Sequence, residues 1–434
     1  MNKKKLKKIT TTTLFYLAVA FIAMIILLPI YFLFSISLMS DQEAYDWPIL
    51  MVPSFVNKFI IMKSSEASDK YILSVYSKTR DEYVTIYESA NLDNMISFAE
   101  RKTNSRIPKD LLLQKIEELE DLYKKNRSEI KAAEEELKDL NRKVRSLNSQ
   151  IREYRKKIEK ITPEMAELQE FKKSLEEKIS ELKKQRDDVE KRIDELTRYL
   201  VSIGSVSFTV PKNLFANYIT FFKVTSDSIP ALIRSIEVAL ATIGISLGIG
   251  GLAGYAFARY FFKGKNLLKL SVLFVRMFPS VSIAMPMVII LAKMGFYDRP
   301  IGLSLVYSVG QIAMTIWITA SIFMGIPIEL EEAAQIFGCS KWGAFFHVTL
   351  PLALPGLAAS AMYAFIGSWS ETAQAIILTQ FNPTFPVVVY QTLVGAKGLV
   401  NLVAAGGVTM ALPAILFTII IRRYILQMWG GITI

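Results

Sequence analysis

The chain has 434 residues, of which 52% are hydrophobic, and it carries a formal net charge of +11. One cysteine, Cys339, and one histidine, His347, exclude a disulfide framework and a metal site built from histidine and cysteine. The positive charges stand at the ends of apolar runs and along a heptad pattern, which fits membrane topology and a solvated coiled coil better than nucleic-acid binding. Charge is concentrated in the middle third of the chain, between long apolar stretches. This division indicates a membrane protein with a polar insertion.

The first apolar run extends from about Leu14 to Leu38 and follows a basic segment, predicted to be a cytoplasmic N-terminus, at residues 1–13. A cleavable signal peptide has an apolar region of about 7–15 residues and then a small-residue cleavage site. This run is longer and lacks a clear site of that kind. We therefore predict an uncleaved first transmembrane helix at residues 14–39.

Residues 40–228 form a polar insertion that we expect outside the cytoplasm. Tyr71–Ser77 and Glu82–Glu88 alternate apolar and polar residues on either side of a short polar turn, which predicts a β-hairpin. Asn94–Lys102 predicts a short helix. The apolar segment that ends at Pro211 is expected to pair with the hairpin, so that these elements form a small β/α base.

Heptads occupy about residues 108–200 and predict an antiparallel coiled-coil hairpin whose arms meet near Thr162-Pro163. Because the second arm is shorter, part of the first arm must pack on something else or fray. The apolar positions of the first arm are Ile130, Ala133, Leu137, Leu140, Val144, Leu147, Ile151, Tyr154, Ile158 and Ile161. Those of the second arm are Leu168, Leu175, Leu182, Val189 and Leu196. The hairpin is either a docking arm for a solute-binding protein or another subunit, or a stabilising spacer.

Five further apolar runs are long enough to cross a bilayer, which takes about 20 residues each. They are Ile229–Phe262, Leu267–Lys293, Ile301–Phe323, Leu354–Thr379 and Val403–Leu426. With six helices, the basic residues of both chain ends and of the second-to-third connection fall on one side, so both termini are predicted to be cytoplasmic. The predicted fold class is an all-α polytopic membrane protein with six transmembrane helices and the coiled-coil insertion. Its core occupies residues 229–428 and its C-terminal tail residues 429–434.

The loop at residues 325–351, between the fourth and fifth predicted spans, is too polar to be buried in lipid. Pro327 suits a helix start, acidic residues follow in the first turns, and Gly338 stands where a helix would end. One face of this helix is apolar and consists of Ile326, Leu330, Ala333, Ala334 and Phe337. Such a helix fits either a groove of a partner protein or the lipid headgroups, and periodicity does not separate the two.

The same loop carries a spaced motif made of Glu332-Ala333-Ala334, Gly338, Val348, Leu350 and Pro351. It resembles the signature loop of binding-protein-dependent ABC permeases, with Val348 where isoleucine is more usual. The resemblance implies a coupling helix that docks in a cleft of a cytoplasmic ATPase subunit. The residues that it assigns to ATPase coupling are Glu331, Glu332, Ala333, Ala334, Gly338 and Pro351.

Three further segments resemble the MalG-type permease subunits of maltose/maltodextrin importers. They are Gly254–Arg259, Met277-Phe278-Pro279 and the tail Trp429-Gly430-Gly431. In that family the glycine-rich tail reaches toward the ATPase pair, which implies the same role for Gly430 and Gly431. The last three residues, from Ile432 on, depart from the family pattern.

The resemblance implies the permease subunit of an ATP-driven sugar importer in a bacterial inner membrane. The implied partners are two copies of a cytoplasmic ATPase subunit that binds ATP and magnesium, a second homologous permease subunit and an extracytoplasmic sugar-binding protein. No G-x-x-x-x-G-K-[ST] motif occurs in the chain. We therefore expect that this chain binds no cofactor and is not itself the enzyme that hydrolyses ATP.

Two residues of the fifth predicted span are candidates for a translocation pathway. Glu371 lies in its outer half and is either a pathway group or a structural group near the outer interface. Trp369 either faces a sugar or belongs to the aromatic belt of the membrane. In the second predicted span, small residues are expected to allow close helix packing. They are Gly244, Gly248, Gly250 and Gly254.

Two other classes of protein are weighed against the importer. A secondary transporter predicts paired halves and several intramembrane acids, and the sequence has no clear internal repeat. A coiled-coil membrane receptor or scaffold would explain the heptads but not the five spans and the signature loop that follow them.

Overall fold

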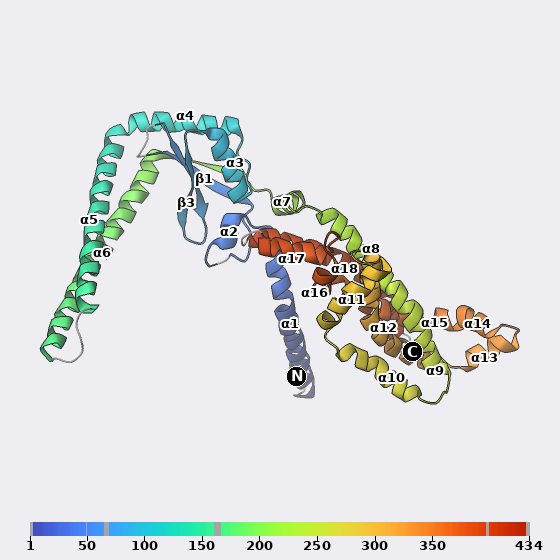
Figure 1. Cartoon of the computed structure of the whole chain (residues 1–434). Coiled ribbons are helices and arrows are strands. Elements are labelled where there is room, and N and C mark those ends of the chain that lie inside the picture. The colour runs from blue at the N-terminus through green and yellow to red at the C-terminus, as the bar shows by residue number, and fades with distance from the viewer. Residues whose placement is uncertain (1–2, 49, 65–68, 160–165, 396–398, 431–434) are drawn as a thin grey trace. The chain divides into compact units, whose positions relative to one another are not determined.

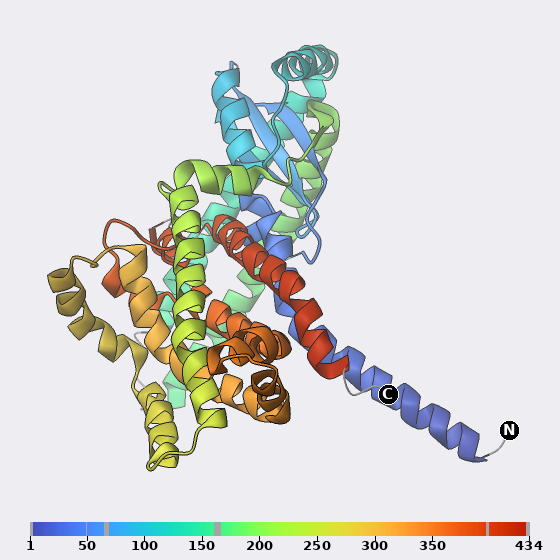
Figure 2. The ribbon, with the colours of Figure 1, turned by 90° about the vertical axis from the view of Figure 1, so that its right-hand side faces the viewer.

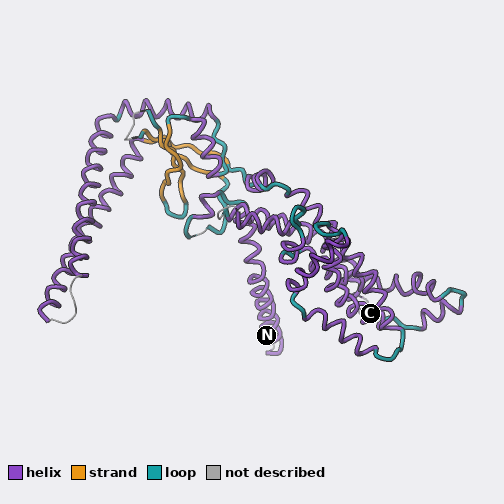
Figure 3. The backbone as a smooth tube through the Cα atoms, viewed as in Figure 1, coloured by secondary structure: helices purple, strands orange, loops and turns teal. Residues whose placement is uncertain are grey.

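Helices make up most of the structure, and the four described strands all lie between residues 56 and 211 (Figure 3). The computed structural model describes residues 3–48, 50–64, 69–159, 166–395 and 399–430. Its contacts divide the chain into two units (Figure 1). The insertion unit is Met39–Leu214, and the core unit combines Met1–Leu38 with Phe215–Ile434. The insertion unit therefore ends before residue 228, because the segment from Phe215 on packs with the core unit.

The insertion unit is built on one antiparallel sheet with the strand order β3-β2-β1-β4. Its strands are β1 (Val56–Lys63), β2 (Tyr71–Ser77), β3 (Glu82–Ser89) and β4 (Ser205–Pro211). The predicted hairpin is confirmed as β2 and β3. The expected pairing of the last strand was wrong, because β4 pairs with β1 and not with the hairpin.

Strand β1 was missing from the sequence prediction. Consecutive residues Phe59, Ile60 and Ile61 are all buried, so the strand lacks the alternation that marks a half-exposed strand. Phe59 stacks on Phe208 of β4 with their ring centroids 5.6 Å apart. The sheet core therefore joins a strand before the hairpin to a strand that follows it by more than a hundred residues.

Helices α3 (Leu92–Thr103) and α4 (Lys109–Lys125) pack on this sheet. Leu112 and Leu119 of α4 are fully buried in the same apolar cluster as Phe59. The predicted first arm of the hairpin is therefore not one helix, since it breaks at Asn126. The part before the break packs on the sheet, as the unequal arm lengths required.

The remaining arm helices are α5 (Arg127–Glu159) and α6 (Ala166–Gly204), which lie side by side (Figure 1). The exposed ion pair between Arg192 and Glu136 marks their register, with the two closest side-chain atoms 3.1 Å apart. Apolar heptad positions of both helices are buried, among them Ile130, Ala133, Leu147, Ile151, Leu175, Ile179, Val189 and Leu196. The interpretation as an extracytoplasmic coiled-coil insertion stays a prediction.

A buried ion pair joins the start and the end of the insertion unit. The Lys212 ammonium, whose side chain is fully buried, contacts the carboxylate of Glu43 from helix α2 (Asp41–Tyr45). Burial alone would raise the pKa of Glu43, but the charge and the hydrogen bond of Lys212 outweigh it and hold this pKa below its ordinary value. Ser54 also donates its backbone N–H to Glu43 at 3.0 Å.

We predict that Lys212→Met destabilises the insertion unit by about 3–5 kcal/mol, because it leaves a buried carboxylate without its partner. The pKa of Glu43 is lowered in the folded chain. The stability that this lowered pKa gives the wild-type unit, and that the variant lacks, is therefore fully present above the unfolded glutamate pKa of about 4.3 and is lost as the pH falls through the lowered folded value. Hydrogen exchange of the β1 and β4 amides in the full chain measures it. The double variant Lys212→Met with Glu43→Leu should lose much less, and equal losses would contradict the role of the pair.

The core unit consists of helices, and five of its described helical stretches are long and apolar enough to cross a membrane, or six if one bent pair counts as a single span. The five are α1 (Lys3–Ser37); α8 (Ser228–Ile245), η1 (Ser246–Gly251) and α9 (Leu252–Arg259); α12 (Pro300–Gly325); α14 (Lys341–Ala344), η3 (Phe345–Thr349) and α15 (Leu350–Trp369); and α18 (Val400–Gly430). The bent pair consists of α10 (Lys265–Phe274) with η2 (Val275–Met277), and of α11 (Ser280–Met294). Shorter helices connect them, namely α7 (Ala216–Val224), α13 (Glu329–Ile336), α16 (Ala373–Leu378) and α17 (Phe385–Gly395).

Helix α12 is the centre of the core unit and packs on α8, η1, α9 and α15, while α15 packs on α18 (Figure 2). Two predicted small residues make this packing close. A Cβ atom on Gly250 would lie 2.9 Å from Cβ of Thr315, and one on Gly254 would lie 2.0 Å from Oγ1 of Thr319. The prediction holds for these two residues only, since Gly244 has no atom within 4 Å of such a Cβ, and neither has Gly248.

The third and fifth predicted spans are not continuous helices. The third bends by 92° between α10–η2 and α11. Phe278 is extended there (ψ 132°), because a residue before proline avoids the helical region and Pro279 has no N–H to donate. The fifth stretch begins at Lys341 and ends at Trp369, which is earlier at both ends than predicted.

Candidate coupling surface and candidate translocation cavity

The predicted helix–glycine–helix structure of the loop is confirmed. Helix α13 ends at Ile336, and the N–H of the capping residue Phe337 donates to the carbonyl of Ala333 at 3.0 Å. Gly338 follows with φ +93°, a conformation that L side chains rarely adopt. Ser340 then caps α14 by accepting the Gly343 N–H at 3.0 Å.

A buried ion pair attaches α13 to the rest of the core unit. Glu331 is only 5% exposed, and its carboxylate accepts from Arg259 Nε at 2.6 Å and from the Tyr255 hydroxyl at 2.7 Å. Arg259 Nη2 also donates to the carbonyl of Ile326 at 3.0 Å. The guanidinium of Arg259, at the end of α9, therefore contacts both α13 and Ile326, the residue that follows α12.

If the apolar face of α13 packed against the rest of this chain, its apolar side chains would be buried and its acidic side chains exposed. The structure shows the reverse. A glutamate is buried, while apolar side chains of α13 and its neighbours are exposed. The most exposed are Phe337 (90%), Ile336 (83%), Trp342 (65%), Phe346 (54%) and Leu330 (44%). We call these five residues the α13 surface. Apolar side chains that stay exposed in this way can form a binding site for a protein or a membrane.

The other residues assigned to coupling lie in different settings. Glu332 and Ala333 are exposed, and Ala334 is half-buried. Pro351 lies near the start of α15 inside a continuous helical stretch, after the π-helical turn η3. Gly430 is the last residue of α18, and Gly431 lies outside the described residues.

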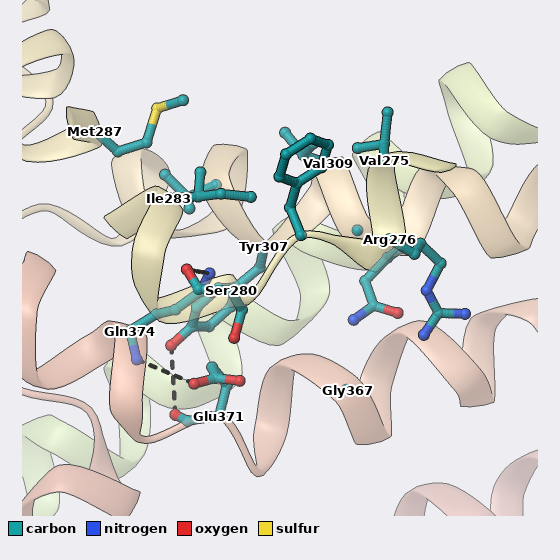
Figure 4. A pocket seen from close by; sticks show the side chains of 14 residues that line it. Val275, Arg276, Ser280, Ile283, Met287, Tyr307, Val309, Gly367, Glu371 and Gln374 are labelled. Carbon is teal, nitrogen blue, oxygen red and sulfur yellow. Dashed lines mark hydrogen bonds between the residues drawn. The ribbon is translucent and has the colours of Figure 1, made fainter. Parts of the chain in front are cut away.

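A second candidate site is a cavity of about 210 Å³ beside the bend of the third span (Figure 4). Its polar lining residues are Arg276, Ser280, Tyr307, Gln311, Glu371 and Gln374. Its apolar lining includes Phe278 and Met287. Within the described ranges, no group of three or more His, Cys, Asp or Glu side chains is arranged to hold a metal ion.

Two breaks in the helices meet at this cavity. The first is the bend at Phe278–Pro279, and the second is the gap of Ser370–Thr372 between α15 and α16. Gln374 Nε2 donates to the Ser280 carbonyl at 2.8 Å and so ties the two breaks together. Irregular backbone is tolerated at membrane depth only where it is buried in protein or lines a cavity.

Glu371 lies in the second break and not inside a helix, which corrects its predicted place in the fifth span. Its carboxylate accepts the backbone N–H of Gln374 at 3.0 Å, and its carbonyl accepts the hydroxyl of Tyr307 at 3.3 Å (Figure 4). Trp369 does not line the cavity. It is 3% exposed, its ring lies 5.5 Å from that of Phe365, and its Nε1 donates to the Met410 carbonyl at 2.9 Å, so it is neither an aromatic-belt residue nor a cavity residue.

The sequence analysis missed Gln311 and Gln374 as cavity residues. Both are uncharged and stand in apolar helices, so neither charge nor periodicity distinguishes them from other buried polar residues. The proline at 279 was the one available signal, since it predicts a helix break next to Ser280.

Comparison with known proteins gives the family. A family model described as "Binding-protein-dependent transport system inner membrane component" matches residues 244–427, which all lie in the core unit. The trehalose transport permease SugB of Mycobacterium tuberculosis is 35% identical over 216 residues, which is 49% of this chain and 78% of that protein. The maltose/maltodextrin transport permease MalG of Vibrio vulnificus is 33% identical over 48% of this chain and 73% of its own length. The trehalose/maltose permease MalG of Thermococcus litoralis is 28% identical over 50% and 79%.

The chain belongs to the inner membrane components of binding-protein-dependent transport systems. The resemblance to ABC permease subunits, inferred from the loop motif, and to their carbohydrate-uptake type, inferred from the three further segments, is confirmed by these relatives. A transporter for the acidic polysaccharide alginate is the source of one similar solved chain, at 20% identity and a TM-score of 0.41, covering 50% of this chain and 82% of that chain. A TM-score of 0.41 is too low for this likeness to support a conclusion about the chain.

We predict that Arg259→Met loosens α13, because Glu331 is left buried without a counter-ion, at a cost of about 3–5 kcal/mol. Cys339 is the one cysteine of the chain and is exposed just beyond Gly338, so it accepts a spin label without further mutation. Electron paramagnetic resonance should report faster label motion in Arg259→Met. Lys263→Met, which removes an exposed cation from the connection after α9, is the matched control. Unchanged label motion in Arg259→Met would rule out the ion pair as the anchor of α13.

Proposed function

We propose that this chain is the permease subunit of an ATP-driven importer for sugars of the maltose/maltodextrin or trehalose type. The observation that supports the coupling role best is the α13 surface, where apolar side chains are exposed while the buried Glu331 anchors the helix through its ion pair with Arg259. The relatives named for trehalose and maltose transport support the sugar class.

In the proposed importer, two copies of a separate ATPase subunit bind ATP and magnesium, and α13 docks on one of them. Closure of the ATPase pair moves α13, and the Arg259–Glu331 ion pair passes this shift to α9 and to the end of α12. A short helix with its own hydrogen bonds moves as a rigid body, as such a lever requires. The second permease subunit, the extracytoplasmic sugar-binding protein and the cytoplasmic location of both termini belong to the same proposal.

We predict that Phe337→Asp weakens association with the ATPase subunit by about 2 kcal/mol or more, the range of aromatic hot spots in interfaces. Phe337 is 90% exposed in the chain alone, so the substitution should leave the fold of the chain intact. Copurification of the ATPase subunit and ATP hydrolysis stimulated by the binding protein measure the effect. Phe171→Asp, an equally drastic change on the exposed surface of α6, is the control for association with the ATPase subunit and should leave its copurification unchanged.

Gly338→Asp tests the turn rather than the surface. Its φ of +93° disfavours any residue with a Cβ, so α14 should lose its placement relative to α13, and stimulated hydrolysis should collapse. If the wild-type chain purifies with no ATPase subunit under conditions that preserve membrane complexes, the importer proposal fails. A receptor or scaffold role would then become the better explanation.

We further propose that the α5–α6 hairpin contacts the sugar-binding protein. Helix α4 belongs to the sheet core, so a clean test must keep α4 and the proximal part of the hairpin. In the register marked by Arg192 and Glu136, residues 143 and 185 face each other. A chain in which a short Gly-Ser turn replaces residues 143–185 should therefore fold, and we expect it to bind the sugar-binding protein at least tenfold more weakly. Unchanged affinity and uptake would indicate that the hairpin is a spacer.

A further inference from the structure

The cavity beside the bend of the third span contains a buried hydrogen-bond acceptor that the described part of the chain leaves without a partner. This acceptor is Oε1 of Gln311, on α12. The amide group packs closely against Gly367 of α15, since a Cβ there would lie 2.3 Å from Gln311 Nε2 and 3.0 Å from Gln311 Oε1. A buried acceptor without a donor costs about 1–3 kcal/mol, so a site that keeps one gains by receiving a donor from a ligand.

Two charged groups of the cavity are also available to a ligand. Arg276 stacks over the ring of Tyr363, with its guanidinium carbon 5.4 Å from the ring centroid. Glu371 accepts one backbone N–H from Gln374. Neither forms an ion pair with any described residue, although both line the same cavity. The cavity therefore offers one cationic donor and one anionic acceptor, with no excess of either charge.

The size and the lining of the cavity also limit what it can bind. At about 210 Å³ the cavity is smaller than the roughly 300–1,000 Å³ of pockets for drug-sized ligands, so it suits one ring and not a whole oligosaccharide. Phe278, Val309 and Met287 add apolar surface to the polar groups. Broken helices in transporters place their free backbone groups at binding sites, and two breaks meet here (Figure 4).

We propose that this cavity binds one uncharged glycosyl unit of the transported sugar, with Gln311 and Glu371 accepting from its hydroxyl groups and Arg276 donating to them. The proposal rests on the proposed importer function and assigns a part of the sugar path to this subunit. It also replaces Trp369, which is packed away from the cavity, as the candidate sugar contact.

The test uses the single cysteine of the chain. Cys339→Ser removes it. Ser280→Cys then places one thiol in the cavity wall, and the backbone carbonyl that accepts from Gln374 is retained. The complete complex with ATPase, second permease and sugar-binding protein is treated with a small methanethiosulfonate reagent, with and without excess maltose and, in a parallel series, trehalose. The sugar that the complex takes up should slow labelling of Ser280→Cys about fivefold. Ser282→Cys, which is exposed on α11 and does not line the cavity, should label at the same rate with or without sugar.

Substitution of the acceptors gives an independent measurement. Gln311→Ala and the isosteric Glu371→Gln should each lower sugar uptake about fivefold, the value of one net hydrogen bond. ATPase association and stimulated hydrolysis should remain. The exposed Gln391→Ala on α17 is the matched control. If Gln311→Ala does not assemble, Gln311→Met, whose side chain has a similar length and lacks the acceptor, takes its place, and Val309→Cys replaces Ser280→Cys in the same way.

The outcomes separate the two proposals. A complex that takes up the sugar, but whose cavity thiol is not protected and whose Gln311 and Glu371 variants transport normally, overturns the sugar subsite and leaves the importer intact. A chain that assembles with no ATPase subunit overturns the importer, and the subsite with it. Equal protection of the Ser280→Cys and Ser282→Cys thiols would indicate a change in the whole complex and would also contradict a local sugar site.

Discussion

The buried ion pair between Arg259 and Glu331 is the interaction on which the arrangement of the core unit depends. A carboxylate taken out of water costs several kcal/mol unless it is paired and hydrogen-bonded. Glu331 meets this condition with one guanidinium and one phenol, at 2.6 and 2.7 Å. Because the acid must face inward, the apolar side of α13 must face outward. The exposed α13 surface is therefore a consequence of where one charge is buried, and it gives the proposed ATPase contact its position.

The same guanidinium is held by a rigid frame. Gly250 and Gly254 let η1 and α9 approach α12 so closely that a methyl group at either position would collide with a threonine. Packed helices of this kind move together and do not bend. The breaks at Phe278–Pro279 and after Trp369 have the opposite effect, since they open backbone and side chains toward the cavity. The core unit thus combines a stiff part, which suits transmission of a movement, with a broken part, which suits contact with a solute.

The insertion unit folds around a core of its own, which is closed by the Glu43–Lys212 pair and by the pairing of β1 with β4. This arrangement explains the unequal arms of the hairpin. Helix α4 is used to cover the sheet, and only α5 is left to pair with α6. The hairpin begins after α4, which covers the sheet, and ends at β4, which is a strand of the sheet. A long helical hairpin can therefore be inserted between them without disturbing the sheet. Any role for the hairpin in recruiting the sugar-binding protein acts through this base.

Local patterns in the sequence determined a large part of this structure. The apolar runs, the β2–β3 hairpin, the heptads of α5 and α6 and the glycine turn after α13 each depend on residues close together in the chain, and each was predicted. The features that only the tertiary structure decided depend on residues far apart in the chain.

Arg259, 72 residues earlier, decides whether Glu331 is a surface acid or a buried anchor. The bend at Pro279 and the break before α16 become one cavity only because Gln374 reaches Ser280, 94 residues away. Hydrophobic periodicity records which side of an element avoids water, but it does not record which partner an uncharged or a charged group will meet there. For that reason the candidate spans and the helix α13 could be found from the sequence, whereas Gln311 and the surroundings of Glu371 could not.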